Sequence, residues 1–197
     1  MKPTPSSTET APALPDGFLR ACDRRGAALP PHILTVNAAT QRLAHFQSDD
    51  PGSDSGRRPE SFALIREYLV STSRVGLGQQ EDSHRTPLGL HRISDKIGAG
   101  APKGTVFRGR QPVGLVQEGH PDAPIAHRIL WLDGLEPGFN RGGDVDTHNR
   151  YIYIHGLGDE SRLGKPDSIG CVHMAADDLI PLFDILPVDT LVWIAEE

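Results

Sequence analysis

The chain has 197 residues, and its 20 Lys and Arg against 26 Asp and Glu give a net charge of −6, which offers no electrostatic reason to bind nucleic acid or an anionic membrane. Its 21 glycines and 17 prolines are typical of short strands joined by many turns and disfavour a helical bundle. No apolar run approaches the roughly 18–20 residues of a membrane span, and two cysteines cannot build a disulfide framework.

The first thirty residues are predicted to be a flexible N-terminal tail, which leaves residues 31–197 as a single domain. Residues 1–17 hold four prolines and lack the roughly 7–15 consecutive apolar residues of a secretory signal. At most one helical turn is expected in this tail, around Phe18–Asp23. Cys22, within that turn, is interpreted as a free thiol without a special role.

From residue 33 onward, short β-branched or aromatic segments alternate with loops that contain Gly or Pro. This pattern predicts about eight short strands, at residues 33–36, 41–46, 62–65, 67–73, 90–93, 128–132, 150–155 and 191–194. Residues 48–60 and 98–124 are predicted to be mostly loop. The domain is therefore expected to be mainly β.

One helix is predicted near the C-terminus. Its apolar positions follow helical spacing, on Leu179, Leu182, Phe183 and Leu186. Asp178 is a suitable N-cap residue, and that start would put Pro181 at the third helical position, where its missing N–H costs nothing. Pro187 is expected to end the helix.

The chemically informative residues lie between the end of the predicted strand at residues 150–155 and the start of the predicted helix. His155 ends the clearest strand and is followed by Gly156. Sixteen residues later comes Cys171, preceded by Ser168 and Gly170 in a Ser-x-Gly-Cys sequence. A cysteine is a nucleophile only as a thiolate, which a neighbouring imidazole can produce, and glycine before it permits a tight turn with backbone N–H groups facing the substrate. The residues alone therefore propose a Cys171–His155 pair for acyl transfer.

Each of these signals is weak when taken separately. A lone cysteine is more often a small buried apolar side chain, and a histidine that ends an apolar strand is more often structural. The combination of the two residues with their glycines is what favours the catalytic interpretation.

Residues 151–174 resemble the catalytic motif of the L,D-transpeptidase family, the YkuD-type domain, which reads His-Gly, then Leu-Gly-x-Pro, then Ser-His-Gly-Cys-Ile/Val-Arg-Met. Further similarity lies in residues 70–72 with 86–89, in 131–135, in 150–155 and in 182–194, so that the resemblance covers about residues 32–194. It implies a β-sandwich-like catalytic domain with one or two short helices. The loops at 76–87 and 98–124 are interpreted as a lid or as a wall of the acceptor site.

By this resemblance, Cys171 is the nucleophile and His155 is the base that later acts as an acid. The implied substrates are peptidoglycan stem tetrapeptides: the thiolate attacks the carbonyl at the L-centre of meso-diaminopimelate, D-alanine leaves, and the acyl group passes to an amine. Residues that support the motif, the substrate or the oxyanion are Gly156, Ser168, Gly170, His173, Tyr153 and Arg150. No cofactor or metal is expected, because the nine histidines lack the clustering of a zinc site.

The chain departs from the family motif at three positions. Ile169 replaces the motif histidine and His173 replaces the motif arginine, so a permanent cation gives way to a side chain that is mostly neutral at pH 7. We hypothesise that activity survives with altered rate or specificity; the alternative is that both positions vary freely. Asp189 stands where glycine is usual and is expected to change only a turn.

Two other functions stay open at this stage. An L,D-carboxypeptidase would resolve the same acyl-enzyme with water, and a pseudoenzyme would bind peptidoglycan without turnover. A depressed pKa of the Cys171 thiol would favour an enzyme over the pseudoenzyme. The family chemistry predicts a periplasmic or cell-envelope location although no export signal is visible, and the sequence leaves the oligomeric state open.

Overall fold

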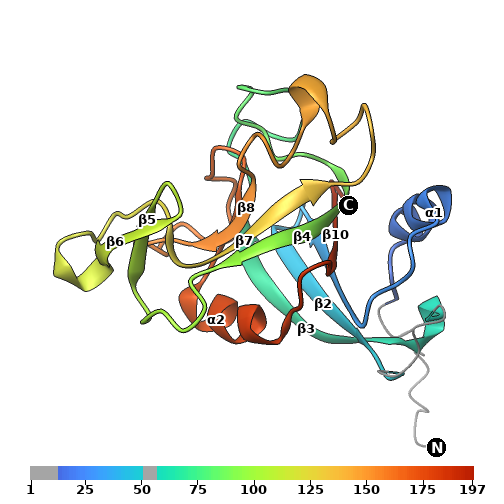
Figure 1. The fold of residues 1–197 in the computed structure, drawn as a ribbon, viewed down its shortest axis with the longest axis horizontal. Coiled ribbons are helices and arrows are strands. Elements are labelled where there is room, and N and C mark those ends of the chain that lie inside the picture. Colours follow the sequence, from blue (N-terminus) through green and yellow to red (C-terminus); the bar gives the residue numbers. More distant parts are fainter. Residues whose placement is uncertain (1–12, 51–56) are drawn as a thin grey trace, which may run out of the picture.

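The chain folds into one sheet that curls back on itself, with a helix at each of two places on it (Figure 1). The structure is a computed structural model that describes residues 13–50 and 57–197. Its strands are β1 (His32–Asn37), β2 (Arg42–Ser48), β3 (Phe62–Ser71), β4 (Gly89–Ile97), β5 (Thr105–Arg108), β6 (Gln111–Leu115), β7 (Ala126–Gly134), β8 (Tyr153–Gly156), β9 (Val172–Met174) and β10 (Leu191–Ala195). The α-helices are α1 (Asp16–Arg25) and α2 (Ala176–Ile185), and short 3-10 turns lie at Pro59–Ser61, Val116–Glu118 and Gly143–Val145.

The sheet closes because β4 pairs with strands on both sides. The strand order is β4-β10-β1-β2-β3-β9-β8-β7-β5-β6, and β4 also pairs with β7. Eight strands therefore form a closed ring, and the β5–β6 hairpin extends from β7 outside it, at the left of Figure 1. The prediction of a mainly β domain with one or two short helices is confirmed, with two α-helices present, but the sandwich-like architecture is wrong in detail: the sheet is a closed, barrel-like one. Strand alternation separates an inner from an outer face, and it does not say how a sheet closes.

Side chains from the closing strands and from α2 fill the inside of this barrel. On β1 and β10, inward-facing Leu34, Val36, Val192 and Ile194 alternate with outward-facing residues, as period-two strands require. The apolar face of α2 packs into the same core through its predicted residues Leu179, Leu182, Phe183 and Leu186. The predicted helix is thus present and packs inward.

The start of α2 differs from the prediction. The helix begins at Ala176, two residues before the predicted cap, so Pro181 is the sixth helical residue. Asp178 does not cap it; the N–H of Ala176 donates instead to Glu160 Oε1 at 2.7 Å. A cap supplied from sixteen residues away leaves no local signal in the sequence.

The predicted tail is ordered where the structure describes it. Instead of one turn, α1 is a ten-residue helix that buries Phe18, Ala21 and Cys22 against the outer face of the sheet. There it joins an apolar cluster that includes Ile33 of β1 and Leu191 of β10. Residues 1–12, the rest of that predicted tail, lie outside the described residues.

Several strands differ from the prediction, either because no strand was expected there or because the strand begins later. The segment predicted as loop around residue 110 contains the β5–β6 hairpin, and β9 precedes α2 where no strand was expected. The strand predicted at 150–155 begins only at Tyr153, because residues 147–151 form a hydrogen-bonded turn in which Tyr151 has a φ of 55°. This turn directs the Tyr151 carbonyl toward the site described below.

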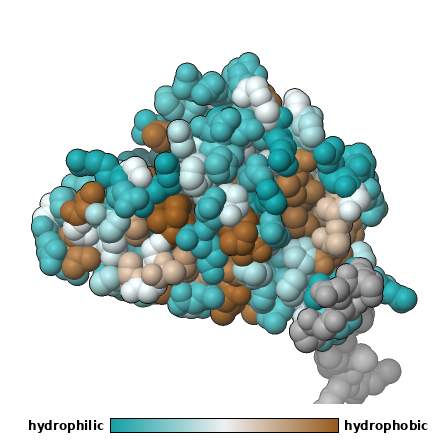
Figure 2. All heavy atoms as spheres, viewed as in Figure 1, coloured by the Kyte–Doolittle hydropathy of each residue, from teal (hydrophilic) through white to brown (hydrophobic). Residues whose placement is uncertain are grey.

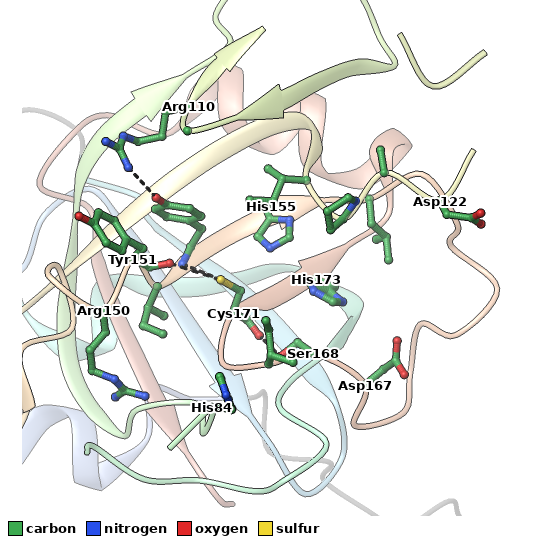
Figure 3. A pocket seen from close by; sticks show the side chains of 18 of the residues that line it. His84, Arg110, Asp122, Arg150, Tyr151, His155, Asp167, Ser168, Cys171 and His173 are labelled. Atoms are coloured by element: carbon green, nitrogen blue, oxygen red, sulfur yellow. Dashed lines mark hydrogen bonds between the residues drawn. The ribbon is translucent and has the colours of Figure 1, made fainter. Parts of the chain in front are cut away.

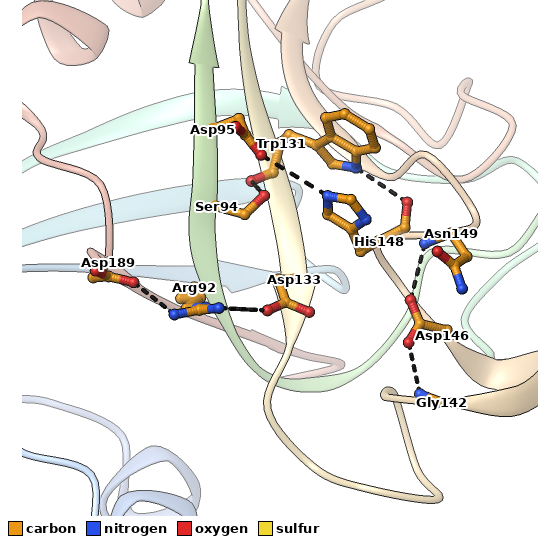
Figure 4. A network of polar contacts seen from close by, with 10 residues as sticks. All are labelled: Arg92, Ser94, Asp95, Trp131, Asp133, Gly142, Asp146, His148, Asn149 and Asp189. Atoms are coloured by element: carbon orange, nitrogen blue, oxygen red, sulfur yellow. Dashed lines mark hydrogen bonds and ion pairs between the residues drawn. The ribbon is translucent and has the colours of Figure 1, made fainter.

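Asp189 does more than shape a turn. Its backbone adopts a φ of 68°, a left-handed conformation in which glycine is the least strained residue. Its carboxylate accepts a hydrogen bond from Arg92 at 2.9 Å, and Arg92 also pairs with Asp133 at 3.0 Å (Figure 4). Since Arg92 lies on β4 and Asp133 on β7, these contacts link the strands that close the barrel.

The hydrophobic residues on the surface do not form one continuous face in the view of Figure 2. On the face seen in Figure 2, hydrophobic residues surface as separate patches among hydrophilic ones. In the part of the chain that the structure describes, neither α-helix is long or apolar enough to cross a bilayer.

Candidate active site

The two residues of the predicted pair come together because β8 and β9 lie side by side in parallel. His155 of β8 is in register with His173 of β9, and Cys171 immediately precedes β9. Cys171, His155 and His173 all line one pocket of about 980 Å³ (Figure 3). The parallel pairing of β8 with β9 therefore brings together His155 and Cys171, which are sixteen residues apart in the sequence.

A tight turn presents Cys171 to this pocket. Ser168 Oγ donates to the Cys171 carbonyl at 2.6 Å and accepts the Gly170 N–H at 3.1 Å. Gly170 has a φ of 127°, which other residues rarely adopt, so glycine is required at this place in the turn. Ser168 and Gly170 thus shape the turn, and the Gly170 N–H is already engaged and not directed at a substrate.

The sulfur of Cys171 is held by backbone groups of the turn before β8 and of the first residue of β8. The Tyr153 N–H donates to Sγ at 3.4 Å, and the thiol donates to the Tyr151 carbonyl at 3.5 Å. Burial raises the pKa of the Cys171 thiol to about 11, although the Tyr153 N–H and the nearby charge of Arg150 act in the opposite direction. The depressed thiol pKa proposed as a mark of the enzyme is therefore absent, and the resting group is a neutral thiol.

His155 is buried, and its ring orientation is set by a backbone carbonyl. Its Nδ1 lies 2.8 Å from the Gly156 oxygen. Because a carbonyl only accepts, Nδ1 carries the proton and Nε2 is left with its lone pair. Burial, with a smaller contribution from His173, lowers the pKa of His155 to about 3, so the imidazole is neutral at rest.

Gly156 is required by packing between strands. A Cβ there would lie 2.6 Å from the His127 ring and 2.8 Å from the Ala126 carbonyl, both on β7. The close approach expected at this glycine is thus made by the neighbouring strand of the same sheet.

His173 packs edge-on against His155, with their ring centroids 4.9 Å apart. Its Nδ1 is buried without a hydrogen-bond partner among the described residues. Burial lowers the pKa of His173, against an opposing effect of Asp167. Where the family motif has a permanent cation, this chain therefore presents a neutral ring. Ile169, the other departure, is 59% exposed on the lining of the pocket.

Arg150 anchors the loop that forms one wall of the pocket. Its guanidinium donates to the carbonyls of Gly78, Gln79 and Arg85, the last at 2.6 Å. Arg150 thus supports the site by holding this loop in place, and Tyr153 supports it through the N–H that contacts the Cys171 sulfur. Both loops that the sequence analysis named as candidate walls line the pocket, through His84 and Arg110 among others.

The sequence analysis missed several side chains that line the pocket: Arg110, Tyr151, His84, Asp122, Arg162 and Asp167. His84, Arg110 and Asp122 come from loops distant in sequence, whereas Tyr151, Arg162 and Asp167 lie within the motif segment but at positions to which the motif assigns no residue type. Across residues 13–50 and 57–197, no three His, Cys, Asp or Glu side chains gather as metal ligands.

Comparison with known proteins adds independent findings. A family model for the L,D-transpeptidase catalytic domain, YkuD, matches residues 31–194. YqjB of Bacillus subtilis (strain 168), named as a candidate L,D-transpeptidase, is 35% identical over 149 residues, which cover 75% of this chain and 73% of YqjB.

Two solved structures share the fold. Bd1075 of Bdellovibrio bacteriovorus superposes with a TM-score of 0.53 at 17% identity, covering 86% of this chain and 49% of that one. The Ldtfm–avibactam carbamoyl enzyme gives a TM-score of 0.50 at 12% identity, covering 86% and 50%. This chain therefore spans about half the length of each of those two proteins.

Proposed function

This chain belongs to the family of L,D-transpeptidase catalytic domains, and on that premise we propose that it forms a cysteinyl acyl-enzyme with peptidoglycan stem tetrapeptides and transfers the acyl group to an amine. The observation that carries the proposal is the placement of Cys171 and His155 in one pocket, with Nε2 of His155 left as the proton acceptor. The same arrangement suits both halves of the reaction.

In the first half-reaction, the Cys171 proton passes to His155 Nε2 as sulfur attacks the carbonyl at the L-centre of diaminopimelate. A C–S bond forms, the C–N bond to D-alanine breaks, and Nε2 returns the proton to the departing amine. In the second, the incoming amine attacks the thioester carbonyl and gives a proton to Nε2; a new amide C–N bond forms, the C–S bond to Cys171 breaks, and Nε2 returns the proton to sulfur. Each half-reaction ends with His155 neutral.

Both partners are neutral at rest, so the ion pair has to form on the reaction path. The thiol proton must first leave the Tyr151 carbonyl, which accepts it in the resting site. The Tyr153 N–H and the charge of Arg150 favour the thiolate once it forms. A bound substrate that excludes water would strengthen both contacts. Since Ser168 engages the Gly170 N–H, we assign the oxyanion to the N–H of Cys171.

The experiment that tests this function is mass spectrometry of disaccharide-tetrapeptides incubated with the protein and, in parallel, with Cys171→Ala. Cross-linked dimers that vanish in the variant are the expected result. Tripeptides without dimers would replace the proposal with an L,D-carboxypeptidase. If wild-type protein binds the tetrapeptide and yields neither product, the chain is a peptidoglycan-binding pseudoenzyme and the proposal fails.

The proposed substrate also sets a location. Peptidoglycan lies outside the cytoplasmic membrane, so we propose that the protein acts in the periplasm or elsewhere in the cell envelope. Fractionation of cells that produce the full-length protein tests this, and recovery from the cytosol alone would contradict it.

A further inference from the structure

The tip of the β5–β6 hairpin places an arginine at the pocket. Arg108 and Gln111 are paired, so Gly109 and Arg110 form a two-residue turn. Their φ angles of 54° and 67° are the left-handed values of a type I′ turn. That conformation is ordinary for glycine and unfavourable for arginine. A strained non-glycine residue beside a pocket is a reason to ask what its side chain does there.

The guanidinium of Arg110 is seated on aromatic rings in the pocket that Cys171 also lines. It lies 4.6 Å from the centroid of Trp131 and 5.2 Å from that of Tyr151, and Nη1 donates to Tyr153 Oη at 3.3 Å (Figure 3). The backbones of Tyr151 and Tyr153 are the groups that contact the Cys171 sulfur. The hairpin therefore places a permanent cation in the same pocket as the nucleophile, at the side-chain ends of the two tyrosines whose backbones hold its sulfur.

Trp131, the ring beneath this cation, is itself fixed in place. It stacks on His148 with centroids 4.0 Å apart and an angle of 4° between the rings, and its Nε1–H donates to the His148 carbonyl at 3.1 Å. His148 in turn lies 3.9 Å from Asp95 (Figure 4). Arg110 thus rests on a pre-organised surface, which lowers the entropy lost when the guanidinium binds a partner.

The other positive groups that line the pocket are committed elsewhere. Arg150 donates to three backbone carbonyls, and Arg162 forms an ion pair with Asp167 at 2.5 Å. Burial keeps His173 neutral. Arg110 makes no ion pair with any described carboxylate, and its one hydrogen bond, to a phenol, leaves donors of the guanidinium fork unused.

We propose that Arg110 binds a carboxylate of the donor peptide beside the scissile amide, and so selects donors that carry a negative charge there. This rests on the proposed function, which supplies the peptide. Two donor groups have the required chemistry: the terminal carboxylate of the leaving D-alanine and the free carboxylate of diaminopimelate. A guanidinium recognises either one through paired N–H donors.

The acidic side chains along the same pocket are compatible with this binding. Glu81, Asp82, Asp122 and Asp159 line the pocket, and Asp122 lies well away from Arg110 (Figure 3). None of the four is within ion-pair distance of Arg110. Asp95 acts on Arg110 from a greater distance and forms no ion pair with it, so the guanidinium remains open to an external anion.

The test is isothermal titration of stem tetrapeptide into Cys171→Ala, with and without Arg110→Gln, which measures binding without turnover. We expect Arg110→Gln to weaken binding roughly 10- to 100-fold, as for loss of a charge-assisted hydrogen bond. Arg110→Lys, which keeps the charge and loses the fork, should fall between. Arg108→Gln, an exposed arginine two residues earlier on the same hairpin, is the matched control and should bind as Cys171→Ala does.

Two modified peptides identify the carboxylate: one amidated at the C-terminus, the other at diaminopimelate. For the peptide that lacks the contacted group, Arg110→Gln should cause no additional loss. An equal loss with all three peptides would make Arg110 a purely structural residue, and no loss, or no binding by any variant, would also overturn the proposal. Because binding is read in Cys171→Ala, Arg110-dependent binding combined with failure of wild-type protein to form product would reject the enzyme and keep the anion site.

Discussion

The two cysteines of this chain both have a thiol pKa raised by burial, but the groups that surround the two sulfur atoms differ. Burial raises the pKa of Cys22 to about 12 and that of Cys171 to about 11. Cys22 faces an apolar cluster under α1, where Asp23 and Glu136 raise its pKa further. Cys171 faces a pocket that also holds His155, and a backbone N–H and Arg150 act to lower its pKa.

This comparison teaches that the resting pKa of a thiol does not by itself identify a nucleophile. What separates the two sites is which groups can take the proton and stabilise the anion during reaction. Among the described residues, no imidazole acts on the Cys22 thiol and no hydrogen-bond donor contacts its sulfur; the two charged groups that act on it are carboxylates, which disfavour the thiolate. At Cys171 the Tyr153 N–H contacts sulfur, and His155 keeps a lone pair on Nε2.

The largest expected effect comes from removing each thiol in turn, which tests whether the two cysteines differ in function. We expect Cys171→Ala to lower product formation by at least about 10³-fold, since the nucleophile is lost. Cys22→Ala should retain full activity and lose stability of about 1–2 kcal/mol, because a small buried side chain is trimmed within an apolar cluster. Turnover and urea unfolding of both variants give the answer. Equal loss of activity in the two would mean that the pocket does not distinguish the cysteines.

A smaller loss of turnover is expected when His155, the proposed general base, is replaced. His155→Gln should reduce turnover by roughly 10²- to 10⁴-fold, the usual contribution of a general base. His91→Gln is the matched control, because His91 is equally buried and has its pKa lowered to about 4, but it contacts Gly89 and Thr147 away from the pocket. If both variants lose activity in proportion to their stability, His155 is structural.

The resting state of this pair predicts a pH profile for alkylation by iodoacetamide. A thiol with a pKa of about 11 gains thiolate steadily as pH rises, so the rate at Cys171 should climb about tenfold per pH unit through pH 9. Cys22, buried under α1, should stay unmodified until the protein unfolds. A plateau in the Cys171 rate below pH 8 would instead show a preformed thiolate–imidazolium pair.

Sequence reasoning located those parts of the molecule whose signals are local. The alternation in β1 and β10 and the helical spacing of Leu179 and Leu182 reported buried faces directly. Ser168, Gly170 and Cys171 belong to one turn, so their arrangement could be predicted from their spacing.

What the sequence did not reveal depends on distant partners. α1 is stable because it packs on the sheet, and its sequence alone suggested a single turn. The Gly109-Arg110 turn lacks the Asn-Gly or Asp-Gly pair that usually signals a type I′ hairpin. Arg110 could be related to Cys171 only through that hairpin and the rings of β7 and β8.

The smallest expected effect tests the two motif departures. Ile169→His together with His173→Arg should raise turnover several-fold if the neutral ring at 173 limits the reaction. His173 Nδ1 is buried beside His155, so an arginine at this position must find a partner. Asp167 is a carboxylate that already acts on position 173. Arginine at 173 would compete with Arg162 for Asp167. We therefore expect His173→Arg to gain more activity when Arg162→Gln is also present, and steady-state kinetics of the single, double and triple variants would show it. No gain in any combination would contradict this hypothesis and favour the alternative that positions 169 and 173 vary freely.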